Sequence, residues 1–519
     1  MSCRRKILIA LAAALFAVLL VSIIHHYQLR FAVEKYIAEL KAKGEPMDLA
    51  QVRPPPVPLE QNSADTFRDA VALFETDQSL LTTNSYSAMT MVAPGKAMIC
   101  SQQPEIRGFN ATNSWQEVTA AVAQNEESLA LLRQIIEKPD FDFQIKYELG
   151  LIDLGYTNLN LAPLKLAALR LGTAALCDLH HGDTTSTVKN LRAMIALVKA
   201  ARDERLVISE LVRIAITQLA LTDNWEILQS PNLTDEQFAA LQLDWMHLEF
   251  IRSSENALVM ERTIGKITLA KWRGSNAELD KNFELGRKTR ENMGFPDEGP
   301  SALATAKRKF GVFMWRYWWS YPDELRSLKS YEVLINTVRL VETNGSFQNA
   351  LSTQDTALDQ LGIRKLKSSL DSLFSGEPDF HSMLSESIVT LGRTFQKVMR
   401  VEAAKQLTVA AIALKRFQSK HGKFPERLAE LTPEFLNEVP LDPVDGKPLR
   451  YRRNADGTFL LYSVGENGKD DGGNPSLEKV AEGSSLNWLN PRALDWVWPQ
   501  PATEEEIQKF FEERGKSGN

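Results

Sequence analysis

An uncharged apolar run near the amino terminus limits what this chain can fold into more than any other feature. The run extends from Ile7 to Ile24 and follows a basic cluster of Arg4, Arg5 and Lys6. A helix of 18 residues is about 27 Å long, close to the roughly 30 Å hydrocarbon core of a bilayer. No basic cluster follows the run directly, which places the amino terminus in the cytoplasm. We therefore predict a single-pass inner-membrane protein, with the bulk of the chain extracytoplasmic, in the periplasm.

A cleaved signal peptide and a buried core helix are the alternatives to an uncleaved signal-anchor. A signal peptide normally ends in a small-residue site of the A-x-A kind. This run ends Val21-Ser22-Ile23-Ile24 instead, and Cys3 lies before it, so no lipid-attachment cysteine follows. The sequence favours a transmembrane helix that stays attached.

Cysteine content and charge exclude several classes of protein. Three cysteines in 519 residues exclude a disulfide-based scaffold and a multi-cysteine zinc site. Cys100 and Cys177 would lie in an oxidising compartment, where a disulfide between them and two free, buried thiols both remain open. The net charge of −6 argues against a nucleic-acid partner, because nucleic-acid-binding domains usually carry a basic excess.

Helical periodicity dominates the chain up to about residue 420. Val188, Leu191, Ile195 and Val198 recur at i, i+3, i+7 and i+10, one of several such apolar stripes. Short connections between the stripes indicate helix hairpins, and no fixed repeat length emerges. We predict a mainly α protein with an irregular α-helical array. The predicted divisions are residues 1–24 (cytoplasmic tip and transmembrane anchor), 25–60 (juxtamembrane helix and Pro-rich linker), 61–392 (helical body), 393–475 (a small α+β module) and 476–519 (C-terminal tail).

Two details of this organisation have alternatives. The proline-rich stretch from Arg53 to Pro58 is either a stiff spacer between the anchor and the body or a loop packed on the body. In the tail, the charged segment from Glu504 to Arg514 is expected to be a loosely attached helix.

The chain contains none of the common phosphate-loop, dinucleotide, zinc-protease or nucleophile-elbow motifs. The most metal-like group is His180-His181-Gly182-Asp183, which we interpret as a helix end, a C′ glycine and the N-cap of the next helix. Glu261 and Arg262 are interpreted as a solvated pair, with a buried ion pair or a site as alternatives. We therefore predict no catalytic, cofactor-binding or metal-ligating residues.

Residues 310–321 combine dense aromatic side chains with a preceding basic cluster, Lys307-Arg308-Lys309. The favoured interpretation is a set of core anchors between helical subdomains. The alternative is a surface that contacts a membrane or a protein partner.

The character of the sequence changes after residue 420, where two strand-like runs, 449–452 and 458–462, flank the turn signal Asn454-Ala455-Asp456-Gly457. Residues 411–473 resemble the globular end of type II secretion major pseudopilins, and the whole chain looks like large bacterial membrane-anchored proteins with this ending. The matching stretches are Ala413-Leu414 with Phe417, Gly422-Lys423-Phe424-Pro425, Leu428, Leu431, Pro440-Leu441-Asp442-Pro443, Gly446-Lys447-Pro448, Tyr451, Leu461-Tyr462-Ser463-Val464-Gly465-Glu466-Asn467-Gly468 and Asp470-Asp471-Gly472-Gly473.

The resemblance implies a helix followed by a hairpin, and it implies a calcium-binding loop after the last strand. Asp470 and Asp471 match the first part of that loop, but Asn474-Pro475-Ser476-Leu477 replaces the acidic stretch that would follow. Calcium needs six to eight oxygen ligands, so we favour a glycine-rich turn held by Asx hydrogen bonds and expect no cofactor. Nearly 390 residues separate the anchor from the module, so the chain should not polymerise as a pilin does.

These observations support one leading hypothesis and two alternatives. The leading hypothesis is a non-enzymatic, membrane-anchored extracytoplasmic protein whose helical body binds a protein partner that the sequence does not identify. The first alternative is an accessory component of a type II secretion or pilus-like envelope system. The second is a hydrolase of envelope polymers, which would need a pair of carboxylates in a cleft.

Overall fold

The computed structural model describes residues 3–74, 77, 79–138, 140–153, 160–292, 302–361, 383–478 and 487–517. Helix accounts for 65% of the structure and strand for 8%. The prediction of a mainly α protein with a small C-terminal sheet is therefore confirmed. Across these described segments, no helix has the length and apolar character that crossing a membrane requires.

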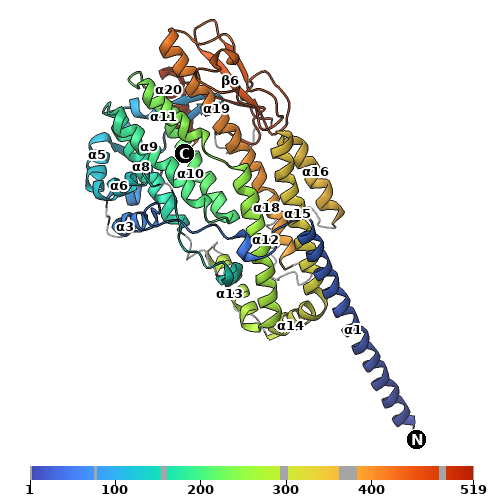
Figure 1. The fold of residues 1–519 in the computed structure, drawn as a ribbon. Helices are drawn as coiled ribbons and strands as arrows, with labels where there is room; N and C mark the ends of the chain where they lie inside the picture. The colour runs from blue at the N-terminus through green and yellow to red at the C-terminus, as the bar shows by residue number, and fades with distance from the viewer. Residues whose placement is uncertain are drawn as a thin grey trace.

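Helix α1 (Cys3–Ala42) leaves the body and extends away from it, with the amino terminus at its far end (Figure 1). The projecting part carries exposed large apolar side chains, among them Ile9, Phe16 and Ile24. Exposed apolar side chains in this number are unusual for a helix surrounded by water.

The last turns of α1 pack against α15 (Ser320–Asn344). Val33 and Leu40 are buried there in a cluster with Leu328 of α15. Met47, just past the end of α1, is fully buried in the same cluster. The chain from Val33 to Met47 is therefore packed against the body.

The chain just before the prolines is also attached to the body. After the short helix α2 (Leu49–Val52), the Arg205 guanidinium donates a 2.8 Å hydrogen bond to the Val52 carbonyl oxygen, and Arg53 pairs with Glu148 at 2.7 Å. These contacts hold the residues at the start of the stretch, and both the stiff spacer and the packed loop stay open for Pro54 to Pro58.

The body is an irregular array of helices around α8, α9 and α10, which pack against one another. One core surrounds these three helices, and a second lies between α12 and α15. The body contains α3 (Ala64–Phe74), α4 (Leu80–Thr83), α5 (Trp115–Gln124), α6 (Glu126–Gln134), η2 (Tyr147–Leu149), α7 (Gly150–Asp153), α8 (Leu161–His180), α9 (Thr184–Arg202), α10 (Val207–Ile227), α11 (Asp235–Met246), α12 (Ile251–Gly274), α13 (Asn276–Asn292), α14 (Ala302–Met314), the π-helical turn η3 (Trp315–Trp319), α16 (Phe347–Gln360) and α18 (Ser385–Gly392).

Short strands near residue 100 were not expected from the sequence. The antiparallel pair β1 (Thr90–Ala93) and β2 (Lys96–Met98) is followed by η1 (Cys100–Gln102) and by a second pair, β3 (Glu105–Arg107) and β4 (Thr112–Ser114). Strand β2 also pairs in parallel with β8 (Gln500–Pro501) from the other end of the chain.

The C-terminal tail contains the predicted helix, which packs on the body instead of being loosely attached. Trp496 and Trp498 are buried, and the indole of Trp225 in α10 donates a 2.8 Å hydrogen bond to the Pro499 carbonyl oxygen. The final helix α20 (Glu504–Ser517) packs against β1, and its Ile507 is buried there.

The predicted C-terminal hairpin is present. Helix α19 (Thr394–His421) ends at Gly422, whose φ of 73° permits the left-handed C-cap. The turn η4 (Leu428–Leu431) leads to strands β5 (Arg450–Arg453) and β6 (Phe459–Val464), which pair antiparallel. The tail supplies a third strand, β7 (Asp495–Val497), which pairs with β6. The sheet therefore depends on residues beyond the predicted module.

Candidate functional site

The histidine pair singled out in the sequence has the structural role that we predicted for it. His180 ends α8, Gly182 has a φ of 79°, and the Asp183 carboxylate accepts a 3.0 Å hydrogen bond from the Ser186 backbone amide at the start of α9. His180 also stacks on Trp115 with ring centroids 4.1 Å apart. The group caps two helices and packs on a third.

Glu261 and Arg262 do not form the solvated pair that we expected. The Arg262 side chain is fully buried and pairs with two distant acids, Glu45 at 3.1 Å and Glu332. The Glu261 carboxylate instead accepts a 2.8 Å hydrogen bond from the Val207 amide, and burial raises its pKa to about 7. Adjacent residues on a helix point in different directions, so adjacency in sequence did not imply a pair.

Cys100 and Cys177 are free and buried. The Cys177 sulfur lies 3.2 Å from the Thr119 hydroxyl oxygen, and the Cys100 sulfur lies 3.5 Å from that of Thr90. The structure therefore contains the two buried thiols, not the disulfide.

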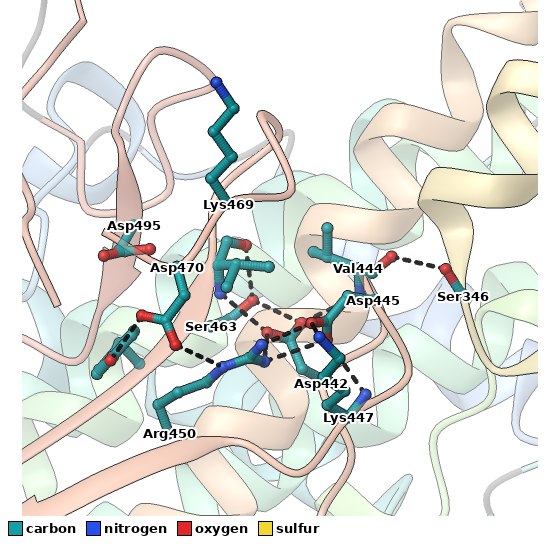
Figure 2. Close-up of polar contacts among 12 residues, drawn as sticks. Ser346, Asp442, Val444, Asp445, Lys447, Arg450, Ser463, Lys469, Asp470 and Asp495 are labelled. Atoms are coloured by element: carbon teal, nitrogen blue, oxygen red, sulfur yellow. Dashed lines mark hydrogen bonds and ion pairs between the residues drawn. The ribbon is translucent and has the colours of Figure 1, made fainter. Parts of the chain in front are cut away.

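In the loop after β6, which the sequence analysis compared with a calcium loop, Asp470 points toward Arg450 and the Tyr462 ring (Figure 2). The loop backbone is held by Asp470 and by Asp495 of β7. Asp470 accepts hydrogen bonds from the Tyr462 hydroxyl at 2.9 Å and the Gly472 amide at 3.1 Å. Asp495 accepts others from the amides of Gly473 at 2.8 Å and Asn474 at 3.0 Å. These contacts agree with the glycine-rich Asx turn.

Asp442 lies at the centre of the same region and is fully buried (Figure 2). Its carboxylate accepts hydrogen bonds from the Val464 amide at 2.9 Å and the Ser463 hydroxyl at 2.8 Å, and it pairs with Arg450 at 2.8 Å. Burial raises its pKa to about 6 despite these donors. Asp442 thus fastens the proline-rich turn before β5 to strand β6.

Several buried acids escaped the sequence analysis because nothing in their local pattern marks them. The Glu226 carboxylate of α10 accepts hydrogen bonds from the Ser101 amide at 2.7 Å and the Met89 amide at 3.1 Å. One helical turn earlier, burial raises the pKa of Asp223 to about 8. Burial likewise raises the pKa of Glu204 to about 7. These groups lie in the interior between packed elements.

Two small surface cavities, of about 20 and 80 Å³, lie among the described residues. The larger is lined by the β2–β3 region and contains one carboxylate, that of Glu105, and the smaller has none. No group of three or more His, Cys, Asp or Glu side chains that suits a metal ion occurs in the part of the chain that the structure describes. Neither cavity offers the carboxylate pair that the hydrolase hypothesis needs.

The part of α1 around His25 and His26, here called the base of α1, packs beside several aromatic side chains. Its His25 and His26 contact the aromatic segment that the sequence singled out. The His26 Nδ1 atom lies 2.9 Å from the Tyr317 carbonyl oxygen, and the His25 ring centroid lies 5.6 Å from that of Trp318. Tyr321 packs on the His26 ring from the next turn, with centroids 5.1 Å apart.

The aromatic segment divides into a buried face and an exposed face. Trp315 is fully buried in the second core, with its ring 6.1 Å from that of Trp272. Phe310, Phe313 and Tyr317 are 66%, 54% and 50% exposed. Trp315 is therefore one core anchor of the predicted kind. The alternative, a surface that contacts a membrane or a protein partner, stays a prediction for the exposed side chains.

Comparison with known proteins adds no assignment to this geometry: no family model, no curated protein and no solved structure matches the chain. The candidate functional site is therefore the base of α1 together with the aromatic segment beside it, on structural grounds alone.

Proposed function

We propose that this chain is a membrane-anchored, non-enzymatic protein that holds a helical, partner-binding body at a bilayer surface. Residues 7–24 would span the inner membrane with the amino terminus in the cytoplasm, and the body would lie on the periplasmic side. The observation that carries this proposal is the projecting part of α1, where the described large apolar side chains, such as Leu11, Phe16 and Leu20, are exposed.

The sequence gives the length of the proposed membrane span, and the structure gives the exposure of its side chains. Between Lys6 and His25 the sequence has 18 uncharged residues. The exposed side chains of Leu11, Phe16 and Leu20 in this run would be costly in water and favourable in lipid. An apolar surrounding would account for such a helix surface.

Because α1 is packed against the body, we propose that the body is held rigidly at the membrane and is not joined to the anchor by a flexible linker. Three contacts bind the end of α1 and the chain after it to the body. They are the cluster around Leu40, the ion pair between Glu45 and Arg262, and the hydrogen bond from the Lys266 ammonium to the Met47 carbonyl oxygen at 2.5 Å. A rigid junction fixes the distance and the orientation of the body relative to the bilayer. The large helical surface then faces away from the membrane, where it can bind a protein partner.

A second candidate function, an accessory role in a secretion or pilus-like envelope system, is favoured by the order of elements from α19 to β6. A long helix followed by an antiparallel hairpin is what the resemblance to pseudopilins implies. In a pseudopilin fibre this helix faces neighbouring subunits, whereas here the body packs against α19. The role would therefore be that of a partner of such a system, not of a polymerising subunit.

The proposal is tested by topology and membrane retention. A reporter that is active only in the periplasm, fused after Asn519, should be active, and one that is active only in the cytoplasm should be silent. The protein should also remain with membranes after a high-salt wash and keep Cys3. A soluble form that begins between residues 25 and 45 would replace the anchor with a cleaved signal peptide.

A matched variant separates anchoring from folding. Lysines introduced at Ala13 and Phe16 oppose insertion by roughly 2.5–3.5 kcal/mol each near a helix centre. Both positions lie on the projecting part of α1, so the double variant should keep the fold of the body and lose membrane retention. Lysines at the exposed positions Glu126 and Glu127 of α6 serve as the control and should leave retention unchanged.

A further inference from the structure

The exposed side of α14 and η3 forms a continuous apolar stripe. Leu303, Phe310, Phe313 and Tyr317 occupy positions i, i+7, i+10 and i+14, which is the spacing of one helix face. All four side chains are at least half exposed. The opposite side of the segment is anchored by the fully buried Trp315, so the stripe is presented on a fixed support.

The same segment is basic. Lys307, Arg308, Lys309 and Arg316 lie between residues 302 and 321, and no acidic residue occurs there. Lys307 and Lys309 are exposed, and the Arg308 guanidinium lies 5.6 Å from the centre of the Phe283 ring. An apolar face with aromatic side chains and flanking lysines is the composition of helices that lie in a membrane interface.

The position of the stripe relative to α1 is the decisive observation. Tyr317, Trp318 and Tyr321 contact His25 and His26, the first two residues after the uncharged run. The aromatic segment therefore lies at the level where α1 would leave the hydrocarbon. In Figure 1, α14 lies at the end of the body from which α1 projects, and the sheet that contains β6 lies at the other end.

We infer that α14 and η3 form a second membrane contact, an interfacial helix whose stripe lies in the boundary between headgroups and acyl chains of the bilayer that α1 enters. Trp and Tyr side chains favour that boundary, and the lysines face anionic phospholipid headgroups. This inference rests on the proposed anchor, because the contact with α1 sets the depth of the stripe. One spanning helix and one interfacial helix at a fixed angle hold the body in one orientation, with the C-terminal sheet farthest from the bilayer.

The experiment uses the full chain in nanodiscs of phosphatidylcholine with phosphatidylglycerol. An environment-sensitive fluorophore is attached to Phe313→Cys in a Cys3→Ser background, where Cys100 and Cys177 are buried and stay unlabelled. Quenching is then measured with spin-labelled lipids that carry the quencher near the headgroup or deep in the acyl chain. The label at residue 313 should be quenched more strongly, roughly twofold or more, by the shallow quencher than by the deep one.

Two other label positions make the result interpretable. Phe109→Cys is the unquenched control: Phe109 is 88% exposed, and nearby Arg107 stacks on Phe511 of α20, at the end of the body away from α14. Phe16→Cys reports on the anchor itself and should be quenched most by the deep lipid. Quenching at residue 16 without quenching at residue 313 would overturn the interfacial helix and leave the anchor intact. No quenching at residue 16 would overturn the proposed anchor and the inference with it.

A charge variant tests the lipid chemistry against a protein partner. Replacing Lys307, Arg308 and Lys309 with Gln should weaken quenching at residue 313 in anionic nanodiscs and leave quenching at residue 16 unchanged. Equal quenching with and without the three charges would overturn the anionic-lipid part of the inference. If residue 313 is shielded from an aqueous quencher in cells but is not quenched by lipid in nanodiscs, the stripe binds a protein and the inference is wrong.

Discussion

The guanidinium of Arg262 lies 3.1 Å from the carboxylate of Glu45, although 217 residues separate them in the sequence. Arg262 also donates a 3.0 Å hydrogen bond to the Pro46 carbonyl oxygen. On the other side, Arg339 of α15 pairs with the same Glu45 at 2.5 Å. Glu45, just past the end of α1, is thus paired with arginines from two helices of the body, α12 and α15. These ion pairs join the proposed anchor to the body.

Replacing Arg262 with Met should destabilise the protein strongly. Arg262 is fully buried, and its loss leaves Glu45 and Glu332 with less compensation in the interior. Removal of one partner from a buried ion pair typically costs about 3–5 kcal/mol. The measurement is the urea midpoint of the full chain in detergent, followed by far-UV circular dichroism. The exposed pair between Arg53 and Glu148 provides the control, because Arg53→Ala should cost no more than about 1 kcal/mol. Equal midpoints for the two variants would contradict the importance of the buried network.

The buried acids predict that stability falls as pH rises through the neutral range. Burial raises the pKa values of Glu261 and Glu204 to about 7, above the ordinary value of 4.5. Between these limits the folded protein keeps protons that the unfolded chain has lost, so the contribution of these groups is present at low pH and is lost as pH rises through about 7. The urea midpoint should therefore be lower at about pH 8 than at about pH 5.

The variant Glu261→Gln isolates one of these acids. A glutamine can still accept the hydrogen bond from the Val207 amide, but it carries no charge at any pH. The variant should therefore lose less stability between the two pH values than the original protein, by an amount on the order of 1–3 kcal/mol. Glu137→Gln removes an exposed carboxyl of the same kind and should leave the pH dependence unchanged. A pH profile of Glu261→Gln that overlays the original would show that Glu261 is ionised in the fold.

The two thiols should be unreactive in the folded protein. Burial raises the pKa of Cys100 to about 12 and also raises that of Cys177, so little thiolate is present and reagents have no access. In a Cys3→Ser background, a maleimide should add to neither thiol in the native state and to both after denaturation, without a reductant. Mass spectrometry counts the additions. A denatured protein that reacts only after reduction would reveal a disulfide instead.

The sequence predicted what local patterns control and missed what distant contacts control. The stripe from Val188 to Val198 and the turn at Asn454 to Gly457 are each complete within a few residues, and the structure contains the helix and the hairpin that they indicate. The pairing of β2 with β8 joins residues about 400 positions apart, and strands of two or three residues carry too little alternation to recognise.

The sequence predicted only part of the candidate site, because the rest of it depends on contacts between distant segments. The aromatic density of residues 310–321 was visible, but a helix segment that buries Trp315 and exposes Phe313 can be separated into two faces only when its neighbours are known. The hydrogen bond between His26 and Tyr317 joins residues that are 291 positions apart in the sequence. No pattern within either segment predicts that contact.

Residues 395–475 should not fold as an independent unit. The sheet formed by β5 and β6 takes its third strand, β7, from residues 495–497, which this piece lacks. Helix α19 is buried mostly by the body: its Lys405 ammonium donates a 2.9 Å hydrogen bond to the Leu248 carbonyl oxygen, and its Leu407 and Leu414 lie in the same core as α8, α9 and α10. A two-stranded hairpin on a single helix buries too little apolar surface to be stable in water. The isolated piece should therefore show no cooperative melting transition and fast amide exchange, whereas the same amides in the full chain should exchange slowly. A sharp transition in the isolated piece would make residues 395–475 a domain in its own right and the surface of α19 an interface between two domains.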